Sequence, residues 1–282
     1  MQTYHTHISS KHRMLDLNLK EVWQYRDLIF LFTKRTFTLT YKQTVLGPAW
    51  IFLNPLISSI IYAFVFGGIA GIGTDGVPQI LFYLSSNAIW IFFSTCVTKN
   101  AQTFTANANV FGKVYFPRLT TPISNVLASV VQFGVQMILV LGFLVYYEII
   151  GEIHPRWEAW LLIPVVLVHL GLLALGCGII ISSLTTKYRD LAILVTFGIQ
   201  LWMYATPVVY SMNELVSNSP RLAILIRLNP MTEPVLVFRY ALLGCGQISP
   251  GWLIYSAVFS LVMLAAGVVL FSRVEKTFMD TV

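Results

Sequence analysis

The chain has 282 residues, of which 56% are hydrophobic and only 11% are charged. Soluble domains carry about 25% charged residues, so this composition excludes an ordinary water-soluble domain. The formal net charge is +6, yet no basic patch stands out away from the apolar segments, and nucleic acid is therefore not an expected partner.

The first 18 residues are a polar N-terminal lead, and residues 19–47 are expected to form an amphipathic helix at the cytoplasmic interface of a membrane. At about 100° per residue, apolar side chains gather on one side of this helix and polar side chains on the other. A helix packed only on the protein would show the same pattern, and the two arrangements are compatible. The apolar side holds Val22, Tyr25, Leu28, Ile29, Phe32 and Leu39, and the polar side holds Lys20, Gln24, Asp27, Lys34, Arg35, Thr38 and Lys42.

Residues 48–275 are expected to form a transmembrane domain, because a helix of about 20 apolar residues crosses a hydrocarbon core ~30 Å thick. Most of the 18 lysines and arginines fall in alternate connecting segments. Since basic loops stay in the cytoplasm, both ends of the chain, including the short tail 276–282, are expected there. The sequence predicts an all-α integral membrane protein with six transmembrane helices, at residues 50–70, 78–98, 122–147, 159–184, 190–211 and 251–272.

The segment 212–250 lies on the expected outer side and is too long for a simple turn. It contains two apolar runs, 221–228 and 232–243, with a break between them at Asn229 and Pro230. Charged residues interrupt both runs, so neither can be a complete span. The pattern predicts two re-entrant half-helices in the outer leaflet, which protein must cover or a wet cavity must adjoin. The charged residues concerned are Arg227, Glu233 and Arg239.

Catalytic motifs are missing from the sequence. Its apolar spans carry almost no carboxylates, since Glu148 and Asp190 stand at span ends. The single Gly-Lys pair, at residues 112–113, lacks the serine or threonine of a phosphate-binding loop. We therefore expect no ATP hydrolysis by this chain alone, and any motor for active transport would be a separate polypeptide.

The cysteines predict neither a disulfide framework nor a zinc site. Cys96 and Cys177 fall inside expected spans, Cys245 stands alone, and no Cys-x-x-Cys pair is present. No metal ligands are assigned.

Polar and aromatic residues recur along the first and fifth expected spans. Aromatic rings with a hydrogen-bonding edge suit the apolar faces and polar rims of sugars, so these residues are candidates for lining a glycan passage. The same residues could instead anchor span ends at the interface or join helices through amide hydrogen bonds. Six spans cannot easily enclose a wide conduit, so a bulky substrate implies a dimer. The candidates are Asn54, Ser58, Tyr62, Phe66, Phe197, Gln200, Trp202 and Tyr204.

Four motifs together resemble the membrane subunits of type-2 ABC exporters of bacterial surface polysaccharides, a group that handles O-antigens, capsules and teichoic acids. The resemblance runs from about residue 20 to residue 275, which is nearly the whole chain, and its first and last motifs are specific. They are residues 41–50 (YKQTVLGPAW), 113–118 (KVYFPR), 206–210 (TPVVY) and 229–232 (NPMT), the last followed by Phe238 and Arg239.

The resemblance implies a homodimer in the bacterial cytoplasmic (inner) membrane, with two copies of a separate ATPase that bind ATP and Mg. It implies export of a lipid-linked glycan, most simply of O-antigen type, through a passage lined by the first and fifth spans. No cofactor is expected in this chain itself. Segment 212–250 would act as the outer gate, through Arg227, Asn229, Pro230, Glu233 and Arg239. Coupling to the ATPase would involve Lys34, Arg35, Lys42, Lys113, Tyr115, Phe116 and Arg118.

Other functions remain open at this stage. A capsule or teichoic acid exporter would have the same architecture, and a small-drug exporter would differ by a narrower, more apolar lining. An intramembrane enzyme acting on polyprenyl-linked substrates would need charged groups near one leaflet. Its only candidate pairs are Arg189 with Asp190, and Glu233 with Arg239.

Overall fold

The computed structural model describes residues 19–42, 46–186, 188 and 190–281, so the polar lead 1–18 and Arg189 lie outside the described residues. Within these ranges the chain forms helices, turns and loops, and no strand. The predicted all-α fold class is confirmed.

Two short N-terminal helices come first. Helix α1 covers Leu19–Gln24 and α2 covers Arg26–Tyr41. One continuous helix was expected over this segment, but the two helices are separated by a break at Tyr25. Val22 and Ile29 are buried, and Leu28 and Phe32 are partly buried, as the amphipathic pattern predicts. Leu39, by contrast, is 60% exposed, since the last turn of α2 extends beyond the elements that cover its earlier turns.

Among the described residues, five helices are long and apolar enough to cross a membrane. The first is built from a 3₁₀ turn at Gly47–Ala49, helix α3 at Trp50–Tyr62 and a π-helical end at Ala63–Ile69. The others are α4 (Gln79–Ala101), α6 (Thr120–Ile150), α7 (Leu162–Thr185, preceded by a 3₁₀ turn at Trp157–Leu161) and α12 (Pro250–Thr281).

The fifth expected span, 190–211, is helical over a shorter stretch than anticipated. Helix α8 covers Leu191–Tyr204, and turns follow up to Tyr210. Pro207 explains the early end, because proline has no N–H to donate and its ring disfavours helical backbone at Thr206. At 1.5 Å per residue, α8 is roughly 20 Å long, which is shorter than a hydrocarbon core.

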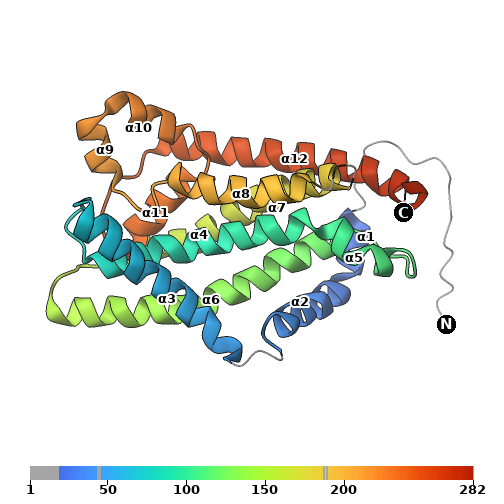
Figure 1. The fold of residues 1–282 in the computed structure, drawn as a ribbon, viewed down its shortest axis with the longest axis horizontal. Coiled ribbons are helices and arrows are strands. Elements are labelled where there is room, and N and C mark those ends of the chain that lie inside the picture. The colour runs from blue at the N-terminus through green and yellow to red at the C-terminus, as the bar shows by residue number, and fades with distance from the viewer. Residues whose placement is uncertain (1–18, 43–45, 187, 189, 282) are drawn as a thin grey trace.

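The outer segment contains three short helices where two were expected. They are α9 (Met212–Asn218), α10 (Pro220–Arg227) and α11 (Thr232–Leu243). The last two coincide closely with the predicted half-helices. In Figure 1, α9 and α10 lie at the opposite end of the bundle from α1, from α5 (Thr103–Phe111) and from the C-terminal end of α12.

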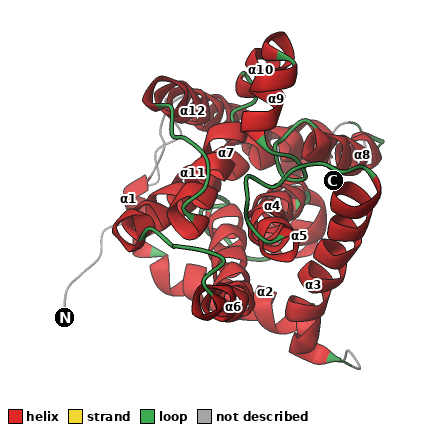
Figure 2. Cartoon of the chain, turned by 90° about the vertical axis from the view of Figure 1, so that its left-hand side faces the viewer, coloured by secondary structure: helices red, strands yellow, loops and turns green. Residues whose placement is uncertain are grey.

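Helix α4 occupies the centre of the bundle, and it is buried on every side from residue 81 to residue 90. It contacts α3, α6, α7, α8 and α11. The end-on view of Figure 2 shows α3 and α8 along one side of the bundle, with α4 further in. Most side chains of α3 and α8 are at least partly exposed, so this side of the protomer is not covered by the protomer's own helices.

Helices α7 and α12 approach each other closely at two glycines. A Cβ atom on Gly176 would lie 2.7 Å from the backbone nitrogen of Leu264, and one on Gly267 would lie 2.8 Å from the carbonyl oxygen of Gly176. Such contacts between backbones are the usual reason for glycine at membrane helix interfaces.

We expect Gly176→Ala to lower the free energy of unfolding by about 1–3 kcal/mol, because the added methyl group overpacks a backbone contact. Gly134→Ala is the matched control, since no heavy atom lies within 4 Å of a Cβ atom there. Thermal unfolding of both variants in the same detergent measures the difference. Equal midpoints for the two variants would contradict the close approach of α7 and α12.

Candidate functional site

The uncovered face of α3 and α8 carries large apolar side chains, which are typical of a surface in contact with lipid or with another subunit. We name this surface, the outward side of α3 and α8, the open face. Its large exposed residues are Trp50, Ile57, Ile60, Ile61, Phe64, Ile193, Leu194, Phe197, Leu201 and Tyr204.

The four candidates on the first span separate into two pairs. Asn54 is exposed and Ser58 is half-buried, with its hydroxyl donating to the carbonyl oxygen of Asn54 at 2.8 Å. Tyr62 and Phe66 are half-buried with their ring centres 6.0 Å apart, and the Tyr62 ring meets that of Tyr83 on α4 at 6.4 Å. Only the first pair is therefore turned to the open face, while the second lies where α3 packs on α4.

The candidates on α8 also divide. Phe197, Gln200 and Tyr204 are exposed, with 58% and 54% exposure for the two aromatic residues. Trp202 turns inward, where its ring meets the edge of Phe93 at 5.2 Å. The Trp202 side chain is thus part of the protomer's interior in this structure, and three of the four candidates on α8 face outward.

Asn229 joins the end of α8 to the turn between α10 and α11. Its Oδ1 accepts from the indole nitrogen of Trp202 at 2.9 Å and from the backbone nitrogen of Met231 at 3.0 Å. Its Nδ2 donates to the carbonyl oxygen of Ala205 and to the hydroxyl of Thr206, both at 2.9 Å. One side-chain amide therefore makes four hydrogen bonds, which is its full capacity.

The same turn is fixed to α12. Tyr255 donates to the carbonyl oxygen of Leu228 at 3.1 Å, and Ser256 donates to that of Pro230 at 2.5 Å. The Ser256 hydroxyl also lies 3.1 Å from Nε2 of His169, a buried residue of α7. The sequence reasoning missed this network, although a histidine inside an apolar stretch was a visible signal for it.

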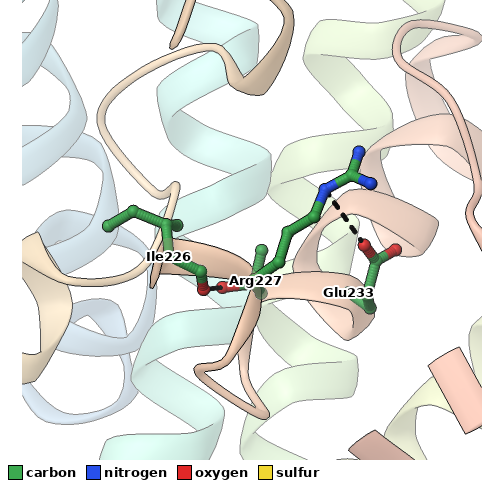
Figure 3. Close-up of polar contacts among 4 residues, drawn as sticks. Ile226, Arg227 and Glu233 are labelled. Atoms are coloured by element: carbon green, nitrogen blue, oxygen red, sulfur yellow. Dashed lines mark hydrogen bonds and ion pairs between the residues drawn. The ribbon is translucent and has the colours of Figure 1, made fainter. Parts of the chain in front are cut away.

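The three charged residues predicted for an outer gate form one ion pair and one separate site. Arg227 Nε lies 3.8 Å from an Oε1 of Glu233 across the break between α10 and α11 (Figure 3). Burial raises the pKa of the Glu233 carboxyl group, and the Arg227 charge acts in the opposite direction. Arg239 does not join this pair. It is 2% exposed, stands over the Phe82 ring at 4.4 Å and donates to the Tyr210 carbonyl oxygen at 3.4 Å.

The loop between α3 and α4 is attached to α9. The backbone nitrogen of Gly73 donates to Glu214 at 3.0 Å, and the Ser211 hydroxyl donates to Asp75 at 2.5 Å. The outer ends of α3, α8 and α11 are consequently connected through short polar contacts. No pattern in the sequence predicts this connection, since the two segments lie far apart along the chain.

At the opposite end of the bundle, the residues proposed for coupling differ in their exposure. Tyr115 is 81% exposed and Phe116 only 5% exposed. Phe116 packs between Phe32 of α2, at 5.5 Å, and Phe111 of α5, at 5.6 Å. Phe116 thus packs the loop against α2, and Tyr115 is the aromatic residue of this loop that lies on the surface. Of the basic candidates, Lys34, Arg35, Lys42 and Lys113 are exposed, and Arg118 is half-buried over the Phe111 ring.

Within the described ranges, no three histidine, cysteine or acidic side chains lie close enough together to hold a metal ion. The three cysteines are free, with Cys96 and Cys177 buried.

A family model for the ABC-2 type transporter matches residues 27–243, which is most of the chain. The matched range includes all residues of the polar contacts around Asn229 except those on α12. The chain belongs to the ABC-2 type transporter family. With several membrane-spanning helices, it is a multi-pass membrane protein of this family.

Among its relatives is the O-antigen export system permease protein RfbA of Klebsiella pneumoniae, 25% identical over 254 residues that cover 90% of this chain and 94% of that protein. The protein of the same name from Myxococcus xanthus is 28% identical over 218 residues, which cover 76% of this chain and 80% of that protein.

For this ABC-2 family member, we expect Asn229→Ala to lower the thermal unfolding midpoint and shift the Trp202 emission, because four hydrogen bonds are lost and buried groups are left unpaired. Asn229→Asp should show an intermediate effect, since it keeps the two accepted bonds and loses the two donated ones. The control is Asn213→Ala, at an exposed position of the same outer region. Equal midpoints for Asn229→Ala and Asn213→Ala would show that Asn229 does not join these helices.

Proposed function

We propose that the chain is the transmembrane subunit of an ATP-driven exporter that moves a lipid-linked polysaccharide of O-antigen type across the cytoplasmic membrane. The observation that carries the proposal is the family match over residues 27–243 together with relatives named as O-antigen export permeases. The open face supports it, because exposed tyrosine, phenylalanine and amide side chains on α3 and α8 suit a sugar chain. Capsule and teichoic acid exporters remain the alternative substrates of the same architecture.

The working unit in this proposal is a homodimer that meets along the open face. Pairing by two-fold symmetry would cover the apolar side chains of α3 and α8 and create a passage between two protomers. Asn54, Ser58, Phe197, Gln200 and Tyr204 would line that passage. Tyr62, Phe66 and Trp202 would support its wall from behind.

Two copies of a separate ATPase, which bind ATP and Mg, complete the proposed exporter. They would bind at the end formed by α1, α2, α5 and the loop 113–118, which the charge distribution assigns to the cytoplasm. Both ends of the chain would lie on this side. Lipid headgroups would meet the exposed basic side of α2.

Deleting the gene for this chain in its source bacterium tests the export function. We expect loss of long-chain polysaccharide from the cell surface and accumulation of the lipid-linked polymer inside the cell, because synthesis would continue without export. A plasmid copy of the gene should restore the surface polymer. Unchanged surface polysaccharide in the deletion strain would contradict the proposal.

Tyr115→Ala tests the proposed coupling surface. A large exposed aromatic residue often contributes much of the energy of an interface, so affinity for the ATPase subunit should fall about tenfold or more. Binding of the purified ATPase to the permease in nanodiscs measures the affinity. Tyr146→Ala, at an exposed tyrosine of the opposite end of the bundle, is the control. If both variants bind the ATPase like the wild type, the docking surface lies elsewhere.

A further inference from the structure

A small cavity lies at the outer end of the bundle, and the export function above does not use it. It is formed where the loop between α3 and α4 meets α9, α10 and α11. The space inside leaves room for about one water-sized group. Its lining includes Asp75 from the loop, Met212 from α9, Arg227 from α10, and Leu236 and Arg239 from α11.

Arg239 brings a buried charge to this cavity. The face of the Phe82 ring, 4.4 Å away, attracts the guanidinium group. One N–H group donates to the Tyr210 carbonyl oxygen over a long distance of 3.4 Å, and a guanidinium group has several more donors. Among the described side chains, no ion pair joins Arg239 to a carboxylate. Since a buried charge is costly without a counter-charge, the remaining N–H groups favour an anion beside them.

Arg227 adds a second guanidinium group to the lining, and its own carboxylate partner is loosely placed. Nε of Arg227 lies 3.8 Å from Oε1 of Glu233, and neither atom makes a hydrogen bond (Figure 3). Glu233 offsets part of the Arg227 charge from outside the lining. The acidic residue of the lining is Asp75, which is exposed and accepts a hydrogen bond from Ser211. The lining itself has two guanidinium groups and one carboxylate, so its net charge is positive.

Size and charge together select the class of ligand. A monatomic anion fits a space of this size, whereas a polyatomic oxyanion such as phosphate or sulfate needs more room. Guanidinium groups bind anions through charge-assisted hydrogen bonds, which are stronger than hydrogen bonds between neutral groups. Water in the same place would leave the Arg239 charge without a partner.

We propose that this cavity binds one small monovalent anion, of the chloride class, between Arg227 and Arg239. The bound anion compensates the buried charge of Arg239 and joins the end of α10 to α11. It thereby stabilises the outer segment in the arrangement that the structure shows. Such an anion is part of the folded protein whatever the substrate is, so this site is independent of the proposed export function.

Chloride dependence of stability tests the site in the full-length protein, reconstituted in nanodiscs of neutral lipid. We expect the thermal unfolding midpoint to be about 2–4 °C higher in sodium chloride than in sodium gluconate at equal ionic strength, because gluconate is too large for the cavity. Radioactive chloride should bind at a single site in each protomer.

Variants of the lining separate this site from a general salt effect. Arg239→Gln removes the buried charge, so chloride affinity should fall about tenfold or more. Asp75→Asn removes the opposing carboxylate, so affinity should rise about threefold. Asparagine tolerates the positive φ of 54° at this position and still accepts from Ser211. Arg221→Gln, at an exposed arginine of α10 outside the lining, is the control and should bind chloride like the wild type.

A wild-type midpoint that is the same in chloride and in gluconate would overturn the anion site. Equal chloride affinity of Arg239→Gln and wild type would also overturn it. So would chloride dependence that appears only in Asp75→Asn, because Asp75 would then be the counter-charge of Arg239. If Arg239→Gln does not fold, Asp75→Asn decides: tighter chloride binding supports the site, and unchanged or weaker binding overturns it. Loss of chloride binding in Arg221→Gln would place the anion elsewhere.

Discussion

Where a helix stops inside a bilayer, its last carbonyl groups need donors from the protein, because hydrocarbon supplies none. Helix α8 stops in this way at Tyr204, and α10 stops nearby at Arg227. Asn229 meets the need at the end of α8, since its amide donates to the carbonyl oxygen of Ala205. At the end of α10, the hydroxyl groups of Thr232 and Tyr255 donate to the carbonyl oxygens of Ile226 and Leu228. Asn229 is the side chain that joins the end of α8 to the turn between α10 and α11.

The contacts around Asn229 give the bundle two unequal sides. Helices α7, α11 and α12 are joined through His169, Ser256 and the turn at Pro230, and they enclose α4 on the far side. The outward side of α3 and α8 instead carries large exposed apolar side chains. In the proposed homodimer, this asymmetry would let a fixed scaffold present the opposite surface to the second subunit and to the substrate.

Much of the fold follows from the sequence by simple physical rules. Long apolar runs give the five long helices, and the half-helices α10 and α11 follow from charged residues and a proline that no full span tolerates. Pro207 also indicates the early end of α8. The long apolar run around it nevertheless predicts a complete span, and that prediction was too long. An apolar run predicts that a segment enters the lipid, whereas a proline predicts where its helix ends.

The site was less accessible to sequence reasoning, because side-chain direction depends on contacts between distant segments. Trp202 was expected to line a passage but turns inward, because Phe93 and Asn229 receive it. Phe116 was expected on a docking surface but is buried by Phe32 and Phe111. Asn54, Gln200 and Tyr115 are exposed, as their proposed roles require.

Hydrogen–deuterium exchange of the protein in nanodiscs tests the central claim most directly. The backbone amides of residues 203–208 and 226–232 should exchange slowly, at rates close to those in the middle of α4, because their hydrogen bonds are made inside the protein. If these segments exchange as fast as the exposed loop around Gly71, the broken helices are not held by Asn229, and the account of the outer half is wrong.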